Sequence, residues 1–222
     1  MSRQLPKPRA LLFDWDGTLV DNWDAIVAAI NEALVTFGKP AWSREEAMDR
    51  ISASQRDSFP VLFGDDWQRA RDIFYAGFER SHLELLQVLD GALPLLDSIG
   101  PVTTGLVSNK SGRHLRKEAE YLGWSPRFHA MIGATDAERD KPDPAPVHMA
   151  LRGTGIAAGP DVWFIGDSAT DLKTARAAGC TAIIVRHAAA NPAAMPPGLS
   201  PDFVADDLAA LQQTLAESLI GS

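Results

Sequence analysis

The stretch Leu11-Leu12-Phe13-Asp14-Trp15-Asp16-Gly17-Thr18-Leu19 is an apolar run that stops at two aspartates two positions apart. Its first half predicts a buried strand. Residues i and i+2 of a strand point to the same side, so Asp14 and Asp16 should face one site and Trp15 the other. A buried carboxylate without a partner costs several kcal/mol. An Asp-Gly turn would also account for these residues, so the rest of the chain decides between a turn and a site.

Short apolar runs elsewhere in the chain, bounded by Gly, Pro, Ser or Asp, predict further strands that are buried on both faces. Together with Ala10–Phe13 they are Val102–Val107, Ala130–Gly133, Val162–Ile165, Thr181–Val185 and Phe203–Ala205. Helical periodicity lies over Ser111–Leu122, Ala145–Arg152, Thr170–Ala178 and Asp207–Leu219. This alternation predicts an α/β fold with a doubly wound, mostly parallel, Rossmann-like sheet.

Residues 21–89 break the alternation, because they show helical periodicity and no convincing strand. Apolar residues repeat at helical spacing at Trp23, Ile26, Ile30, Leu34 and Phe37, and again at Trp67, Ile73, Phe74 and Phe78. Ser43 and Glu46 have the spacing of a capping box. We expect residues 1–20 and 90–222 to form an α/β core and residues 21–89 to form an inserted α-helical cap domain.

The composition excludes several classes of partner. The chain has 222 residues and a formal net charge of −8, which argues against a nucleic-acid backbone or an anionic membrane. No apolar run reaches the roughly 18 residues of a membrane span and no signal peptide is evident, so we expect a cytoplasmic protein.

Cys180 is the only cysteine and predicts a small buried side chain. We interpret the histidines, which lack metal-ligand spacing, as surface or packing residues: His82, His114, His129, His148 and His187.

Polar residues gather where the predicted strands end. Asp14 and Asp16 end the first strand, and Ser108-Asn109-Lys110 follows the second. Gly166-Asp167-Ser168-Ala169-Thr170-Asp171 follows the strand at 162–165, and Lys141 lies in the Pro-rich loop ahead of that strand. Open α/β sheets bind ligands beyond the carboxyl ends of their strands, so we expect these segments to converge on one crevice.

Four carboxylates in one crevice need a cation. At an effective dielectric constant of about 20, each pair about 4 Å apart costs roughly 4 kcal/mol. An all-oxygen set without His or Cys suits Mg²⁺ better than Zn²⁺. Lys141 could neutralise a phosphate, and Ser108 could hydrogen-bond its oxygens. One aspartate is then left to attack phosphorus and a second to act as general acid and base.

Four motifs in this order make the sequence resemble the haloacid dehalogenase superfamily of phosphohydrolases. Asp14-Trp15-Asp16-Gly17-Thr18 matches the family's Asp-x-Asp-Gly-Thr, and Ser108 matches its Ser/Thr at the end of the second strand. Lys141 matches the family's lysine, and Gly166-Asp167 with Asp171 matches its Gly-Asp-x-x-x-Asp. The helical insertion resembles the α-helical cap of phosphoglycolate phosphatases and β-phosphoglucomutases.

The resemblance implies separate roles for the first two aspartates. Asp14 is the nucleophile, while Asp16 protonates the leaving oxygen and then activates water. The dehalogenases proper and the phosphonatases lack an aspartate at the position of Asp16, so its presence argues against both activities.

The resemblance also implies a metal site and a phosphate site. Mg²⁺ sits on Asp14, the Asp16 carbonyl and Asp167, with Asp171 close by. The phosphoryl group is bound by Ser108, Asn109 and Lys141. Structural alternatives stay open: Asp171 could cap the helix that follows it, Lys141 could be a solvated surface lysine, and Ser108 could be a plain strand-end residue.

Arg56 is the best candidate in the cap for contacting the end of the substrate away from the phosphate, with a simple surface arginine as an equal alternative. Residues 21–90 carry 13 Asp/Glu and 7 Lys/Arg. Such an acidic lid disfavours polyanionic substrates and favours a single phosphate on a modest leaving group.

These observations predict a Mg²⁺-dependent phosphatase that acts on a small organic phosphate monoester through an aspartyl-phosphate. Phosphoglycolate is the default substrate by resemblance. One alternative is a phosphosugar mutase of the β-phosphoglucomutase type, although we see no paired basic residues in the cap suited to it. A non-catalytic binding protein on the same fold is the other. The expected partner is a small phosphorylated metabolite, with no nucleic acid and no membrane, and the sequence assigns no oligomeric state.

Overall fold

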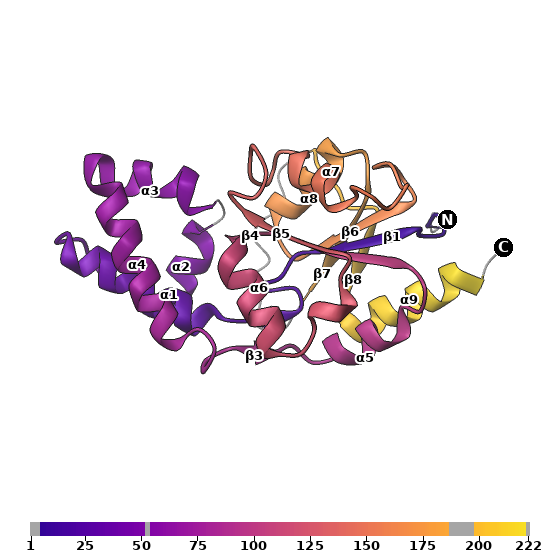
Figure 1. The fold of residues 1–222 in the computed structure, drawn as a ribbon, viewed down its shortest axis with the longest axis horizontal. Helices are drawn as coiled ribbons and strands as arrows, with labels where there is room; N and C mark the ends of the chain where they lie inside the picture. Colours follow the sequence, from indigo (N-terminus) through magenta and orange to yellow (C-terminus); the bar gives the residue numbers. More distant parts are fainter. Residues whose placement is uncertain (1–4, 52–53, 187–197, 221–222) are drawn as a thin grey trace.

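A six-stranded parallel sheet forms the centre of the larger part of the molecule (Figure 1). The computed structural model describes residues 5–51, 54–186 and 198–220. The strands lie in the order β5-β4-β1-β6-β7-β8, and every neighbouring pair is parallel. Their bounds are β1 (Ala10–Phe13), β4 (Thr103–Ser111), β5 (Ala130–Ala134), β6 (Val162–Gly166), β7 (Thr181–Val185) and β8 (Phe203–Ala205). The expected doubly wound, Rossmann-like sheet is confirmed.

Helices cover both faces of this sheet, because alternate strand residues contribute to two separate apolar clusters. Leu11 and Phe13 of β1 belong to the cluster on one face, and Ala10 and Leu12 belong to the cluster on the other. The first face packs against α5 (Ala92–Ser98), α6 (Gly112–Tyr121) and α9 (Leu208–Ile220), and the second against α7 (Ala145–Ala150) and α8 (Ala169–Ala177). A short 3-10 helix, η2 (Ser125–Arg127), follows α6.

The order of the strands determines where a ligand can bind. The chain moves outward from β1 through β4 to β5 on one side, and from β6 through β7 to β8 on the other. Ligands of open α/β sheets bind at such a reversal, beyond the carboxyl ends of the strands. Here the reversal lies at the carboxyl ends of β1, β4 and β6. Asp14 follows β1 directly, Ser108 lies near the end of β4, and Asp167 follows β6 directly.

Four helices form a second body with an apolar core of its own beside the sheet (Figure 1). They are α1 (Trp23–Thr36), α2 (Arg44–Arg50), α3 (Gln55–Phe63) and α4 (Trp67–Ser81), with the 3-10 helix η1 (Gly64–Asp66) between the last two. The capping box predicted at Ser43 and Glu46 begins α2. The helical segment is therefore confirmed, while the division into a core of residues 1–20 and 90–222 and a cap of residues 21–89 stays a prediction.

A short antiparallel strand pair connects the two bodies. β2 (Val20–Asp21) pairs with β3 (Gln87–Val88), with Val20 opposite Val88. The expectation that residues 21–89 contain no strand is wrong at β3. Two residues are too few to show an alternating pattern, so sequence periodicity could not reveal this strand.

Strand β4 extends further than the apolar run predicted. It continues to Ser111, so Ser108, Asn109 and Lys110 belong to the strand and do not follow it. Its pairing with β5 shifts register between Val107 and Ser111. Irregularities of this kind re-aim side chains, and here they bring three consecutive polar residues to the crevice.

The remaining expectations concern single residues and the membrane. Cys180 is buried, as predicted. His82 and His114 are buried, whereas His187 lies outside the described residues. None of the helices in the described ranges has both the length and the apolar character needed to span a bilayer.

Candidate active site

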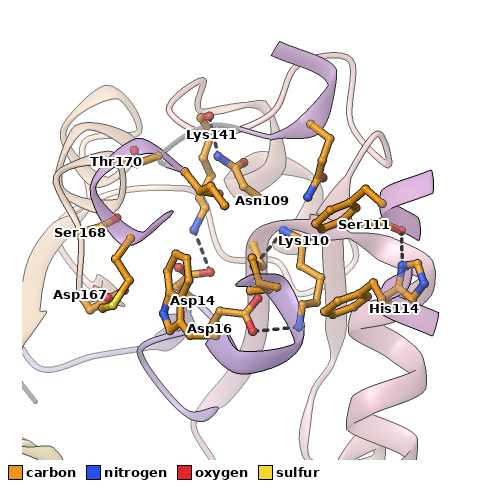
Figure 2. Close-up of a pocket in the computed structure, with 18 of the residues that line it drawn as sticks. Asp14, Asp16, Asn109, Lys110, Ser111, His114, Lys141, Asp167, Ser168 and Thr170 are labelled. Atoms are coloured by element: carbon orange, nitrogen blue, oxygen red, sulfur yellow. Dashed lines mark hydrogen bonds and ion pairs between the residues drawn. The ribbon is translucent and has the colours of Figure 1, made fainter. Parts of the chain in front are cut away.

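A cavity of about 180 Å³ lies between the carboxyl ends of the strands and the helices of the cap (Figure 2). The sheet side contributes Asp14, Asp16, Ser108, Asn109, Lys110, Ser111, His114, Lys141, Asp167, Ser168, Ala169 and Thr170. The cap side contributes Trp23, Ile26, Met48, Asp49, Ile51, Gln55, Phe74, Tyr75 and Phe78. The structure thus brings the predicted core-motif residues together, except that Asp171 lies just behind the cavity wall.

Lys141 is buried among carboxylates. Its Nζ lies 2.9 Å from Asp14 Oδ1 and donates a hydrogen bond to Asp171 Oδ1 at 2.7 Å. Burial lowers the pKa of Lys141, but Asp14 and Asp171 outweigh burial and raise this pKa above its ordinary value. Burial, partly opposed by Lys141, raises the pKa of Asp14. Lys141 is therefore a charged, buried partner of Asp14 and not a solvated surface lysine.

Lys110 pairs with Asp16, although sequence reasoning assigned Lys110 no role. Its Nζ donates to Asp16 Oδ1 at 2.8 Å and to Glu118 Oε2 at 2.6 Å. Burial raises the pKa of Asp16 to about 7, with Lys110 lowering this pKa in part and Glu118 raising it. A carboxyl group with a pKa near neutrality is populated in both protonation states, which suits a general acid and base.

Asp14 also forms a cluster with two further carboxylates, those of Asp167 and Asp171. Asp14, Asp167 and Asp171 each present an oxygen within 4.8 Å of the others. Burial, followed by repulsion from Asp171 and Asp14, raises the pKa of Asp167 well above its usual range. A buried cluster of oxygen donors with excess negative charge fits a hard cation such as Mg²⁺. The Asp16 carboxylate lies outside this cluster because it pairs with Lys110.

Asp171 caps helix α8, which is the structural alternative considered for it. It closes a capping box with Ser168, the N-cap residue of α8, so one carboxylate oxygen accepts hydrogen bonds from Ser168. The other oxygen accepts the hydrogen bond from Lys141. Because both oxygens are engaged, Asp14 and Asp167 are the carboxylates better placed to contact a metal directly.

Ser108 and Asn109 reach the cavity but differ in what they can offer an anion. The Ser108 Oγ accepts a hydrogen bond from the Lys110 amide, and among the described contacts its hydroxyl proton has no acceptor. It can therefore donate to a phosphate oxygen. Asn109 Nδ2 donates to the Lys141 carbonyl at 3.1 Å, so Asn109 also holds the lysine loop in place.

Glu118 is the hub of the polar network behind Asp16. Its carboxylate is fully buried and accepts hydrogen bonds from Trp15 Nε1 at 2.7 Å and Asn22 Nδ2 at 2.9 Å. Lys110 Nζ is a further donor, and His82 Nδ1 lies 2.8 Å away. These partners come from the loop after β1, the entry to the cap, strand β4 and the end of α4. Glu118 therefore ties the cap connection to the residue that holds Asp16.

Arg56 does not line this cavity. Its guanidinium forms an ion pair with Asp140 Oδ1 at 2.9 Å, and Arg56 borders a separate depression that is more open to solvent. The expectation that Arg56 contacts the far end of a substrate therefore has no support in this arrangement. Arg56 instead connects α3 to the loop that carries Lys141, because Asp140 is the residue before that lysine.

The cap side of the cavity is mostly apolar and aromatic. Trp23 and Ile26 come from α1, and Phe74, Tyr75 and Phe78 come from α4. Sequence periodicity placed Trp23, Ile26, Phe74 and Phe78 on the apolar faces of helices. A helix face toward a cavity and a helix face toward a packed core have the same spacing, so the pattern could not separate the two.

The family described as haloacid dehalogenase-like hydrolase matches residues 11–185, most of the length of this chain. The chain belongs to this family. The matched range includes every core-motif residue discussed above, from Asp14 to Asp171. The family resemblance drawn from the four motifs is therefore confirmed.

Two phosphatases and one solved hydrolase are similar to this chain over most of their length. A phosphoglycolate phosphatase of Xanthomonas campestris is 32% identical over 183 residues, which cover 79% of this chain and 82% of the relative. An N-acetylmuramic acid 6-phosphate phosphatase of Pseudomonas putida is 28% identical over 220 residues, which cover 96% and 98%. A solved haloacid dehalogenase-like family hydrolase of Streptococcus pneumoniae has a TM-score of 0.82 at 20% identity, over 93% of this chain and 98% of that chain. This last similarity concerns the fold alone.

Two functional residues of this haloacid dehalogenase-like hydrolase, Lys110 and Glu118, can be recognised from their positions in the sequence, although they were not predicted. Lys110 follows Ser108-Asn109 directly at a strand end. Glu118 lies at helical spacing from Leu115 and beside Ala119, on the apolar face of α6. A charge on a buried helix face needs a buried partner, and that partner is Lys110.

Replacing Glu118 by glutamine should lower the free energy of unfolding by about 3 kcal/mol, because Lys110 loses one of its two buried carboxylates. Urea or guanidinium denaturation measures this change. Glu120→Gln, an exposed position on the same helix, is the matched control and should change stability by less than about 0.5 kcal/mol. A loss below about 1 kcal/mol for Glu118→Gln would contradict the hub role.

Proposed function

We propose that this protein is a Mg²⁺-dependent phosphatase that hydrolyses a small organic phosphate monoester through an aspartyl-phosphate intermediate. The observation that carries the proposal is the pairing of Asp14 with Lys141 and of Asp16 with Lys110 in one cavity. One aspartate is held beside a buried positive charge where a phosphoryl group would bind. The other has a pKa of about 7.

In the first step, a carboxylate oxygen of Asp14 attacks phosphorus. A bond forms between Asp14 and phosphorus while the bond from phosphorus to the leaving oxygen breaks. Asp16 donates its proton to that oxygen, so the leaving group departs as a neutral alcohol. Lys141 and the Ser108 hydroxyl lie where they can stabilise the charge on the transferring phosphoryl group.

In the second step, water attacks the phosphorus of the aspartyl-phosphate. Asp16, now deprotonated, accepts a proton from this water, and the bond between phosphorus and Asp14 breaks. Inorganic phosphate leaves, and both aspartates return to their starting protonation states. The contact with Lys110 holds Asp16 in position for both proton transfers.

Asp14 and Asp167, with the Asp16 carbonyl, are the groups that would hold Mg²⁺, and Asp171 would lie close by. When bound, the ion would neutralise the clustered carboxylates and the charge of the phosphate. Burial and, after it, repulsion from Asp171 and Asp14 raise the pKa of Asp167, and a cation bound beside these carboxylates would favour the charged form of Asp167.

The cap side of the cavity, called the cap wall below, would contact the leaving group of the substrate. The relatives named above act, by their names, on phosphoglycolate and on N-acetylmuramic acid 6-phosphate, so names do not decide between a small acid and a sugar. Among the described residues lining the cavity the cations are Lys110 and Lys141, and each already contacts two carboxylates. An aromatic wall without a further cation supports a leaving group such as a sugar over the negatively charged glycolate.

A phosphosugar mutase would share the first step and then pass the phosphoryl group to a second sugar hydroxyl. The described cap residues of the cavity include no basic pair that could hold a second phosphate, which favours hydrolysis. Release of inorganic phosphate distinguishes the phosphatase, whereas accumulation of a bisphosphorylated sugar without phosphate release would support the mutase. A non-catalytic protein would hydrolyse no aryl phosphate with Mg²⁺ present.

Asp14→Asn should lower the turnover of p-nitrophenyl phosphate in the presence of Mg²⁺ by at least about 10³-fold, because the amide cannot attack phosphorus. Asp65→Asn, at an exposed position of η1, should retain full activity. Full turnover by Asp14→Asn would show that another group is the nucleophile.

The rate constant kcat/KM should fall above about pH 7 as Asp16 loses the proton that it must donate. Lys110 lowers the pKa of Asp16, so Lys110→Met should raise this pKa and move the alkaline limb to higher pH. Lys173→Met, at an exposed position of α8, should leave the limb in place. A limb that stays fixed or moves to lower pH in Lys110→Met would contradict the assignment of Asp16.

A hexose 6-phosphate should be hydrolysed with a kcat/KM at least about 10-fold higher than 2-phosphoglycolate, because the glycolate carboxylate finds no cation at the cap wall. Phosphate release from each compound measures the ratio. Gln55→Lys places a cation on the cap side of the cavity and should shift the ratio toward phosphoglycolate. A preference of the unaltered protein for phosphoglycolate would contradict the inference that the cap wall disfavours a charged leaving group. It would leave the phosphatase assignment intact.

A further inference from the structure

Three side chains with metal-ligand chemistry converge where the end of α4 meets α6. Glu79 and His82 belong to the last turn of α4 and the residue after it, and His114 belongs to α6. One carboxylate oxygen of Glu79 and one ring nitrogen of each histidine lie within 4.8 Å of one another. Glu79 Oε2 is 2.8 Å from His114 Nε2 and 3.9 Å from His82 Nε2. The proposed hydrolysis uses none of these groups.

The other ring nitrogen of each histidine is engaged elsewhere. His82 Nδ1 lies 2.8 Å from Glu118 Oε1. His114 Nδ1 lies 3.2 Å from Ser111 Oγ (Figure 2). Metal-binding histidines in proteins have this arrangement, in which one nitrogen is oriented by a carboxylate or hydroxyl and the other is left for the metal. Both Nε2 atoms are consequently directed at Glu79.

One atom of the cluster has no partner. His82 is fully buried, and its Nε2 has no hydrogen-bond partner in the described structure. A buried polar atom of this kind needs an explanation, because most such atoms are satisfied. Phe78 stacks on the His82 ring, with ring centroids 4.8 Å apart, and so restricts its orientation. The unpaired nitrogen is held in place and directed into the cluster.

The charges around the cluster leave one oxygen of Glu79 for a metal. Lys117 and Arg113 both contact the other oxygen, Oε1. Within the described parts of the chain, no further carboxylate belongs to this group of three ligands. Two imidazoles and one carboxylate are a donor set for Zn²⁺ or a similar transition metal, and not for Mg²⁺. Glu79 is partly exposed, which leaves room for water as a fourth ligand.

We propose that Glu79, His82 and His114 form a second metal site, specific for Zn²⁺ or a similar transition-metal ion, at the edge of the cavity that His114 lines and with ligands distinct from the Asp14, Asp167 and Asp171 cluster. Zinc ligands lie about 2.0–2.2 Å from the ion, so the three atoms would need to move by only a fraction of an ångström to about 1 Å. The site would join α4 of the helical body to α6 of the sheet-containing body. The proposal of this metal site does not rest on the proposed phosphatase activity.

The test uses the full-length, metal-free protein titrated with ZnSO₄ by isothermal calorimetry, with Mg²⁺ present to occupy the carboxylate cluster. One Zn²⁺ should bind per chain, and Co²⁺ should give the intense visible absorption of four- or five-coordinate cobalt. Glu79→Gln and His114→Gln should each weaken Zn²⁺ binding by at least about 10-fold. His129→Gln, an exposed histidine, and Asp167→Asn, in the phosphate site, should bind Zn²⁺ as the unaltered protein does.

Loss of hydrogen bonds alone would give a different pattern. If Glu79→Gln and His114→Gln lowered the melting temperature while the unaltered protein bound no Zn²⁺, the cluster would be a hydrogen-bonded contact and the proposal would be overturned. Zn²⁺ binding that disappears in Asp167→Asn but persists in Glu79→Gln and His114→Gln would also overturn it. Zn²⁺ should raise the melting temperature of the unaltered protein and leave that of both ligand variants unchanged.

Discussion

Each of two buried lysines bridges two carboxylates, and the candidate site depends on this arrangement. Lys141 joins Asp14 to Asp171, and Lys110 joins Asp16 to Glu118. Without these lysines the carboxylates would face one another in a poorly screened cavity and repel. The lysines come from different segments, so the ion pairs also hold the loop after β1 against β4, α6 and the start of α8. The groups proposed to do chemistry are thus the same groups that hold the crevice together.

The parts of the site that could be predicted are those in which a charge interrupts an apolar strand. Asp14 and Asp167 follow buried strands directly, where a carboxylate is conspicuous in the sequence. Glu118 lies in a helix rich in charged residues, and only its place on the buried face distinguishes it. Phe74 illustrates a limit of a different kind, since its spacing shows burial but not whether a core or a cavity lies beside it. Strand β3 was missed because it is too short to have a pattern.

The helical body and the sheet-containing body meet through polar contacts that converge on the site from two directions. Arg56 reaches Asp140, next to the lysine that pairs with Asp14. His82 and Asn22 reach Glu118, which holds the lysine that pairs with Asp16. The position of the helices is therefore linked to both aspartates through two intervening residues on each side, Asp140 and Lys141 on one and Glu118 and Lys110 on the other. The cap wall and the phosphate side of the cavity are parts of one polar framework.

The strand pair β2–β3 has a consequence for how this protein can vary. The chain leaves for the helical body at Val20 and returns at Val88, and these two residues are paired neighbours. The helical segment therefore begins and ends at nearly the same point in space, so its two covalent connections to the sheet lie side by side. Helices between these points can be lengthened, shortened or exchanged without altering the register of any strand in the sheet. Changes in this segment that spare Asn22, Arg56 and His82 can alter the cap wall without removing the contacts that this segment makes to Glu118 and Asp140.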